Sequence, residues 1–259
     1  NESSDEVQAE EHMQNKVALV IGGTGGIGSE ICLSLAAAGF DVAIHYHSNS
    51  NRAHELAEEI KKMGRRAHIF NCDIIERVAV EKMIESVIKR FESISVLINC
   101  STSKIGSIKF SNLVWNDFQA HIDNQILGAF NLIQIVTPYM EKNKYGKVVH
   151  INSQALESPS SDWLPYITAK GALSGFTRAL AYDLAPKGIM LNMVSPGMTD
   201  TELISDVPER TRLVTAAKTP LRRLATPKDI AKAVVFLSTD QSDFLCGETI
   251  RVNGGQVML

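Results

Sequence analysis

Short apolar segments rich in β-branched residues alternate with segments of helical periodicity along most of the chain, and this alternation limits the possible folds more than any other feature. Strands that alternate with helices of ten or more residues indicate βαβ units and a parallel sheet. Both faces of such a sheet are covered, which explains why its strands are continuously apolar. We therefore predict one α/β domain, a doubly wound parallel sheet of about seven strands with helices on both faces. The predicted strands are residues 16–21, 41–46, 66–72, 96–99, 147–151, 189–194 and 249–252.

Composition excludes several classes of protein. The 259 residues are 44% hydrophobic, which is enough for one sizeable core. No apolar run approaches the roughly 18–20 residues of a membrane-spanning helix, and no signal peptide is visible, so we expect a soluble cytoplasmic protein. Five of the 29 acidic residues and none of the 26 basic ones lie in residues 1–12. The remainder is nearly neutral, without the basic stripe of a nucleic-acid-binding protein. The four cysteines show no zinc-ligand spacing, so no metal site is expected.

A glycine-rich segment, Ile-Gly-Gly-Thr-Gly-Gly-Ile-Gly over residues 21–28, joins the first predicted strand to the first predicted helix. Glycine is needed where the backbone turns sharply and where a pyrophosphate approaches too closely for a Cβ atom. The helix N-terminus adds free N–H groups and the positive end of its dipole. This context favours a dinucleotide site over a connector without a ligand. The residues expected to contact the cofactor here are Gly22, Thr24, Gly26, Ile27 and Gly28.

The end of the second predicted strand bears on the choice of cofactor. Enzymes of this architecture that use NAD place Asp or Glu there, bonded to the ribose hydroxyls. The residues here are His47, Ser48 and Asn49, which cannot repel a 2′-phosphate and can donate hydrogen bonds to it. We therefore expect NADP(H), with no arginine evident nearby. His45 and His47 are equally compatible with ordinary strand-end histidines.

Residues 1–12 do not share the pattern of the rest of the chain. They are polar, acidic and aperiodic, which predicts disorder. Position 1 is not Met, whereas Met13 directly precedes the first predicted strand. We interpret residues 1–12 as a disordered tag or leader and residues 13–259 as the dinucleotide-binding domain.

Tyr166 and Lys170 lie four residues apart at the start of a predicted helix, so their side chains share one face. A nearby ammonium and a helix N-terminus both favour phenolate, which would lower the tyrosine pKa toward neutrality. Ser153 follows the strand that ends at Ile151, at the edge of the sheet where ligands bind. These residues suit a catalytic acid/base with a hydroxyl that holds a carbonyl oxygen. A Tyr–Lys pair alone is also compatible with a solvated helix face.

Ser153, Tyr166 and Lys170 behind this glycine loop resemble the short-chain dehydrogenase/reductase family over about residues 14–259. The resemblance implies a Rossmann fold and reduction of a ketone, with Tyr166 as proton donor. It further implies that Lys170 lowers the tyrosine pKa and that Asn124 completes the active site and holds a relay water. Its Gly-Gly near the C-terminus matches Gly254-Gly255. Further cofactor contacts are implied at Asp73, Ile74, Asn99, Ser101, Pro196, Gly197, Met198, Thr199 and Thr201.

Within that family the chain is most similar to the bacterial 3-oxoacyl-[acyl-carrier-protein] reductases, judged by its ending around Gly247 to Gly255. This similarity implies fatty acid biosynthesis and docking of acyl carrier protein at Lys144 and Lys187, which are also compatible with plain solvation. The segment 99–102, Asn-Cys-Ser-Thr, replaces the family's Asn-Asn-Ala-Gly, and Trp163 stands where the family has small residues.

Three functions therefore stay open: a reductase of a 3-oxoacyl thioester, an oxidoreductase of a small alcohol, polyol or ketone, and a dinucleotide-binding subunit without turnover. The complete set of candidate catalytic residues argues against the last of these. The family's long helices pair across subunits, which implies a homotetramer built on residues 115–140 and 165–185.

Overall fold

The computed structural model describes residues 16–258, so the tag or leader predicted for residues 1–12 and the start at Met13 lie outside the described residues. Seven strands form one sheet, and every neighbouring pair is parallel. This confirms the predicted fold class. The strands are β1 (Val17–Ile21), β2 (Asp41–Tyr46), β3 (Ala67–Asn71), β4 (Val96–Asn99), β5 (Gly146–Ile151), β6 (Ile189–Pro196) and β7 (Thr249–Val252).

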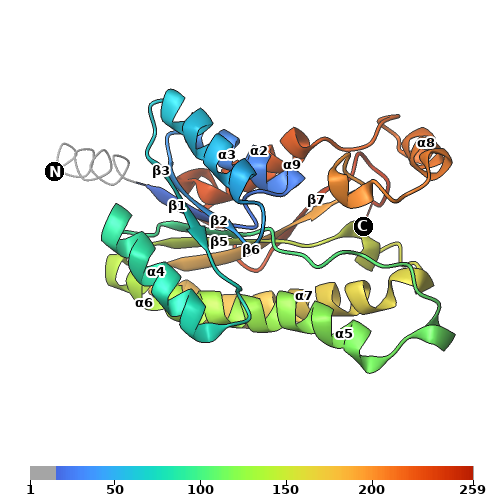
Figure 1. Ribbon diagram of the computed structural model, residues 1–259, viewed down its shortest axis with the longest axis horizontal. Helices are drawn as coiled ribbons and strands as arrows, with labels where there is room; N and C mark the ends of the chain where they lie inside the picture. The colour runs from blue at the N-terminus through green and yellow to red at the C-terminus, as the bar shows by residue number, and fades with distance from the viewer. Residues whose placement is uncertain (1–15, 259) are drawn as a thin grey trace.

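Eight α-helices are found among the described residues. Most of them connect one strand to the next along the chain and pack on the faces of the sheet (Figure 1). Helices α2, α3 and α9 cover one face of the sheet, and α4, α6 and α7 cover the other. They are α2 (Gly26–Ala37), α3 (Ser50–Lys62), α4 (Arg77–Phe91), α5 (Trp115–Ile122), α6 (Gly128–Asn143), α7 (Leu164–Leu184), α8 (Glu209–Lys218) and α9 (Pro227–Ser238).

The strand order β3-β2-β1-β4-β5-β6-β7 has its turning point between β1 and β4. From β1 the chain continues to β2 and β3 toward one lateral edge of the sheet, and from β4 it continues to β5, β6 and β7 toward the other edge. Ligands bind at such a switch point, outside the carboxyl ends of the strands. Two apolar cores, one on each face of the sheet, hold the layers together. Strand β1 contributes to both, with Leu19 in one core and Val20 in the other.

The helix predicted over residues 115–140 is not continuous. A π-helical turn, Asp123–Leu127, separates α5 from α6. One extra residue per turn changes which side chains face the sheet, and such turns are frequent at functional sites. The polar side chain buried by this turn is that of Gln125.

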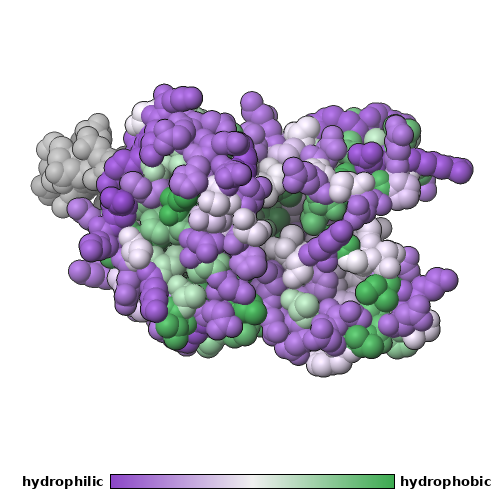
Figure 2. Space-filling view, in the orientation of Figure 1, coloured by the Kyte–Doolittle hydropathy of each residue, from purple (hydrophilic) through white to green (hydrophobic). Residues whose placement is uncertain are grey.

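Helix α8 was not predicted from the sequence, because it contributes no buried residue to either core. It stands apart from the two helical layers (Figure 1). Figure 2 shows the surface hollowed between the part of the molecule that carries α8 and the part that carries α5. Within residues 16–258, no helix is long and apolar enough to cross a membrane.

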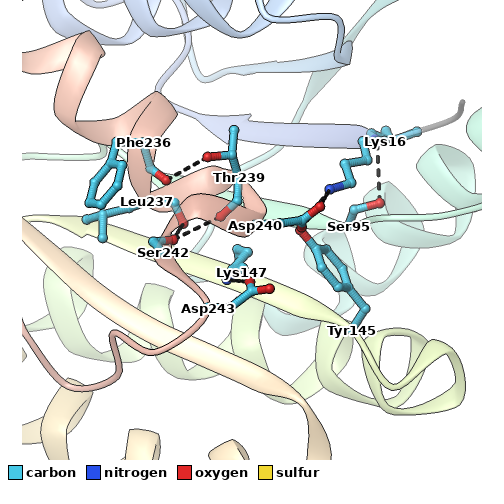
Figure 3. Close-up of polar contacts among 11 residues, drawn as sticks. Lys16, Ser95, Tyr145, Lys147, Phe236, Leu237, Thr239, Asp240, Ser242 and Asp243 are labelled. Atoms are coloured by element: carbon cyan, nitrogen blue, oxygen red, sulfur yellow. Dashed lines mark hydrogen bonds and ion pairs between the residues drawn. The ribbon is translucent and has the colours of Figure 1, made fainter. Parts of the chain in front are cut away.

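A polar network fastens the opposite end of the sheet, where β1 and β5 begin (Figure 3). The ammonium of Lys16 donates to both carboxylate oxygens of Asp240, at 2.7 and 2.8 Å, and the Tyr145 hydroxyl donates to the same carboxylate at 2.9 Å. Lys147 is only 2% exposed, and its ammonium lies 2.6 Å from the Asp243 carboxylate. These contacts tie the segment after α9 to the start of two central strands.

The Lys147–Asp243 pair gives a stability prediction. Replacing Asp243 by Ala leaves a buried ammonium without its charged acceptor, so the free energy of unfolding should fall by about 2 kcal/mol. The matched control is Glu58→Ala, which removes a carboxylate 2.8 Å from Lys61, a lysine that is 47% exposed. Urea unfolding should show a clear loss for the first variant and none for the control. Equal midpoints for both would refute a stabilising role of the buried pair.

Candidate active site

One cleft of about 440 Å³ opens at the carboxyl ends of the central strands. It lies at the switch point that the strand order defines. Residues from the glycine loop, from the loop after β4, from β5 and α7 and from the segment after β6 all line it. The predicted site residues brought together here are Ile27, Ser153, Tyr166, Lys170, Pro196, Gly197, Met198, Thr199 and Thr201.

At Gly26 and Gly28 the glycine loop packs too closely for a side chain. A Cβ atom on Gly28 would lie 2.1 Å from the Gly22 carbonyl oxygen, and Gly22 itself has a φ of +69°. A Cβ on Gly26 would lie 2.8 Å from a side-chain carbon of Thr201. The loop is thus drawn against the first turn of α2, and the segment after β6 lies over it. Such a loop exposes the first N–H groups of α2 to a phosphate.

Tyr166 and Ser153 form the polar floor of the cleft. Tyr166 is buried at the start of α7, and Ser153 follows β5. Burial raises the pKa of the Tyr166 phenol, and a side-chain hydrogen bond with Ser153 acts in the opposite direction. Ser153 is therefore one group that favours the phenolate. The expectation that Lys170 also lowers this pKa stays a prediction.

The side chain of Lys170 is buried beneath Tyr166, with its Nζ 5.7 Å from the centre of the phenol ring. Its ammonium donates to the carbonyl oxygen of Ile151 at 2.7 Å and to Oε1 of Gln125 at 2.9 Å. Burial lowers the pKa of Lys170 to about 7. The two carbonyl acceptors favour the charged form and oppose that shift.

Gln125, not Asn124, is the amide that reaches Lys170. The Gln125 amide nitrogen donates to the Ser101 carbonyl at 2.9 Å and to Oδ1 of Asn124 at 2.8 Å. Asn124 is only half buried and stands one residue away from the contact. The π-helical turn determines which of the two neighbouring amide side chains faces Lys170. The sequence pattern does not indicate where this turn lies.

Asn99 and Ser101 support the loop after β4. Oδ1 of Asn99 accepts from the backbone and the hydroxyl of Ser101, at 3.1 and 2.6 Å. The Ser101 carbonyl then accepts from Gln125. The unusual segment 99–102 is therefore bonded, through Gln125, to Lys170.

The predicted adenosine end lies apart from the cleft, around the ends of β2 and β3. Residues His47, Ser48 and Asn49 are exposed, and Asp73 is half buried, with its carboxylate 3.9 Å from the His47 imidazole. The side chain of Ile74 is buried against Gly128 and cannot face a cofactor, which leaves only its backbone for that role. His45 serves the fold, since its Nδ1 accepts from the Gly22 N–H at 3.1 Å.

An arginine that was not predicted from the sequence lies in this region. The first turn of α3 carries Arg52, whose backbone N–H donates to the Asn49 side chain at 3.1 Å. A surface hollow is lined by Arg52, Asn49 and Thr24 together. Arg52 is engaged by Glu59 at 2.7 Å, and its side chain is 31% exposed. The sequence signal that could have indicated Arg52 is its position three residues after Asn49, which places it in the first turn of the helix that Asn49 caps.

The segment after β6 is pinned in place. Residues 198–200 pair with Ala225, through the N–H groups of Asp200 and Ala225 at 2.9 and 3.0 Å. The Thr199 hydroxyl donates to the Gly197 carbonyl at 2.9 Å. This holds Pro196 to Thr201 between the glycine loop and the floor of the cleft.

Comparison with known proteins identifies the family. A family model described as enoyl-(acyl carrier protein) reductase matches residues 22–256. The 3-oxoacyl-[acyl-carrier-protein] reductase FabG of Staphylococcus epidermidis is 32% identical over 246 residues, which cover 94% of this chain and all of that protein. The 7alpha-hydroxysteroid dehydrogenase of Escherichia coli K12 is 31% identical, over 95% of each chain.

A solved structure agrees with these sequence matches. The 7alpha-hydroxysteroid dehydrogenase complexed with NADH and 7-oxo glycochenodeoxycholic acid superimposes with a TM-score of 0.90, at 30% identity, over 95% of this chain and 96% of that one. Because both the family model and the relatives span nearly all of the chain, the protein belongs to the short-chain dehydrogenase/reductase family of oxidoreductases.

Proposed function

We propose that the protein uses NADPH to reduce a ketone to a secondary alcohol, with a 3-oxoacyl thioester of acyl carrier protein or coenzyme A as substrate. The observation that carries the proposal is the convergence of Ser153, Tyr166 and Lys170 on a cleft that also reaches the glycine loop. Similarity to the Staphylococcus reductase over its whole length supports the substrate class.

The residues present fit a dinucleotide. Glycine is obligatory at Gly28, and the loop it permits leaves the first amides of α2 free for the pyrophosphate. Pro196 to Thr199 line the cleft beside Tyr166 and Lys170, where the nicotinamide end would be held. When bound, the reduced cofactor supplies the hydride that the ketone carbon accepts.

Tyr166 acts as the proton donor in this proposal. Its pKa is raised by burial, so the phenol is protonated at neutral pH and can deliver a proton to the alkoxide oxygen as that oxygen develops. The Ser153 hydroxyl donates a hydrogen bond to the same oxygen. Two fixed donors in a buried cleft stabilise the developing charge better than water does.

Lys170 stabilises the phenolate that remains after the proton has left. Its own pKa is near neutrality, so its charge depends on the carbonyl groups of Ile151 and Gln125. In our proposal Gln125 takes the supporting place that we expected for Asn124. It acts by positioning Lys170 and keeping it charged.

NADP(H) is our proposed cofactor. The chain has no carboxylate at residues 47–49, and Arg52 lies with Asn49 and Thr24 along one hollow, where a 2′-phosphate could be bound. Glu30 and Glu55 line the same hollow, and the carboxylates of Glu55 and Glu59 already pair with the arginine. The preference therefore depends on Arg52 exchanging its carboxylate partners for the phosphate.

Assembly and location remain predictions. Leu127 and Phe130 are exposed on the α5–α6 side, as a tetramer built on the long helices requires.

Lys144 and Lys187 precede β5 and β6, at the end of the sheet opposite the cleft, and the Lys187 ammonium lies 2.8 Å from the Glu141 carboxylate. This geometry does not favour docking of acyl carrier protein there beside the same subunit's cleft.

A second candidate substrate class is a small or cyclic ketone. The similarity to 7alpha-hydroxysteroid dehydrogenase in both sequence and structure favours it, as do the apolar cleft residues Ile105, Trp163 and Leu203. The candidate catalytic residues of the cleft suit either substrate class.

Absorbance at the NADPH band, followed with acetoacetyl thioesters and with simple ketones, tests the proposal. We expect turnover with the thioester. Turnover with small ketones alone would favour the second class, and binding of cofactor without any turnover would support the non-catalytic subunit.

Replacing Tyr166 by Phe should lower kcat by about 10²–10⁴-fold, because the proton donor is lost while the apolar ring remains. Cofactor affinity should change little. The control is Tyr182→Phe, on the same helix and 90% exposed, which should keep full activity. Full activity in the Tyr166 variant would overturn the assignment of the proton donor.

Replacing Gln125 by Leu removes one acceptor of the Lys170 ammonium, so the pKa of Lys170 should fall further. Lysine is charged below its pKa. The alkaline limb of the kcat/KM profile should therefore move to lower pH, by about one unit. Gln125→Asn should restore part of the shift, and Gln119→Leu, on α5, should show none. A Gln125→Leu variant that folds and keeps the original alkaline limb would contradict the positioning role.

Replacing Arg52 by Ala should raise the KM for NADPH about tenfold and leave the KM for NADH nearly unchanged, because only NADPH carries the 2′-phosphate. Arg77→Ala, which alters an exposed arginine on α4, serves as control. Steady-state kinetics with both cofactors provide the readout. Equal changes for the two cofactors would argue against a phosphate contact at Arg52.

A further inference from the structure

The cleft has an uneven charge. Lys170 and Lys218 are the charged side chains that line it, and no Asp or Glu among the described residues does so. Lys170 is buried and engaged with two carbonyl groups, as described above. Lys218, at the C-terminal end of α8, is exposed. The cleft therefore presents one accessible positive charge that the reaction itself does not use.

Lys218 has no carboxylate partner within 4.0 Å in the part of the chain that the structure describes. Two other basic side chains, those of Arg223 and Lys104, do have such a partner. Arg223 is paired with Asp229, and Lys104 with Asp206 at 3.0 Å. An exposed ammonium that borders a cleft without acidic groups attracts an anion.

The backbone at Lys218 is fixed relative to the catalytic serine. The next residue, Thr219, is buried, and its hydroxyl accepts from the Gln256 amide at 2.8 Å. Oε1 of Gln256 accepts from the side-chain amide nitrogen of Gln154 at 2.7 Å, and Gln154 directly follows Ser153. A Cβ atom on Gly254 would lie 2.7 Å from the Thr219 methyl, so the C-terminal segment also packs against this point. A chain of side-chain contacts thus joins the end of α8 to the floor of the cleft.

The rest of the wall near Lys218 is largely apolar. Ile105, Trp163, Leu203, Ile204 and Val257 line the cleft, together with Thr215 on α8. Such a wall suits an acyl chain or ring body, and a lone cation at its border suits a charged end on the same molecule.

We propose that Lys218 recognises an anionic group that the substrate carries in addition to its ketone. The inference rests on the proposed function, because it names the substrate class of that same cleft. The recognised chemistry is a phosphate or carboxylate with several acceptor oxygens. Two sources offer it: the phosphates of a coenzyme A or phosphopantetheine thioester, and the carboxylate of a keto acid.

Matched substrate pairs separate these sources. Acetoacetyl-coenzyme A is compared with acetoacetyl-N-acetylcysteamine, which lacks phosphates, and 7-oxo glycochenodeoxycholic acid is compared with its methyl ester. Lys218→Gln should lower kcat/KM for the recognised anion about tenfold, through KM, and leave its neutral counterpart within about twofold. The control is Arg210→Gln, which removes the same charge from α8 at a residue that does not line the cleft.

A binding measurement makes the inference testable without turnover. Trp115 and Trp163 are the two tryptophans, and only Trp163 lines the cleft, so its fluorescence can be followed in a Trp115→Phe background. Titration compares pantetheine 4′-phosphate with pantetheine, and the bile acid with its ester. At least one anion should bind about tenfold more tightly than its neutral form, and Lys218→Gln should abolish that preference.

The outcomes distinguish the two claims. An anion preference that Lys218→Gln removes supports the inference even if no ketone is turned over, in which case the proposed reductase function fails by itself. No anion preference in the wild type, or a preference that survives in Lys218→Gln, overturns the role of Lys218 even if the reductase activity is present. An equal loss in Arg210→Gln would show a general charge effect and overturn it as well.

Discussion

The buried ammonium of Lys170 is the constraint on which the site depends. A lysine charge at this depth is costly, and burial is the main cause that lowers its pKa to about 7. The charge is kept by two carbonyl oxygens, from Ile151 at the end of β5 and from Gln125 in the π-helical turn. Both acceptors exist only because the sheet, α7 and the turn between α5 and α6 meet at this point. The fold therefore controls the charge of Lys170 by placing these two acceptors beside its ammonium.

This arrangement links parts of the site that are distant in the sequence. Ser101 follows β4, Gln125 bridges it to Lys170, and Lys170 lies beneath Tyr166. The segment 99–102, which departs from the family pattern, thus bears on the acid/base residues as well as on the cofactor groove. A change in that loop would be transmitted to the lysine through one amide side chain.

The sequence predicted the fold well because its signals are local. Continuous apolar strands and the glycine segment before α2 are visible in short windows, and the parallel sheet follows from their alternation. The features that were missed depend on tertiary context. The choice of Gln125 over Asn124 depends on a π-helical turn, and α8 buries no side chain and so leaves no apolar periodicity. Arg52 was overlooked because its role depends on how α3 begins beside the glycine loop. The helical spacing of Tyr166 and Lys170 predicted their proximity, whereas the burial that shifts the pKa of both groups depends on tertiary packing.

The central claim is that, in this cleft, a ketone carbon accepts a hydride from the bound reduced cofactor and the ketone oxygen accepts a proton from Tyr166. The most direct test is a single turnover of acetoacetyl-coenzyme A with NADPH that carries deuterium at the transferred C4 position, followed by NMR of the product. The account predicts a 3-hydroxyacyl thioester with one deuterium on its carbinol carbon. Recovery of unlabelled ketone and unchanged cofactor, with the same result for 7-oxo glycochenodeoxycholic acid, would contradict it.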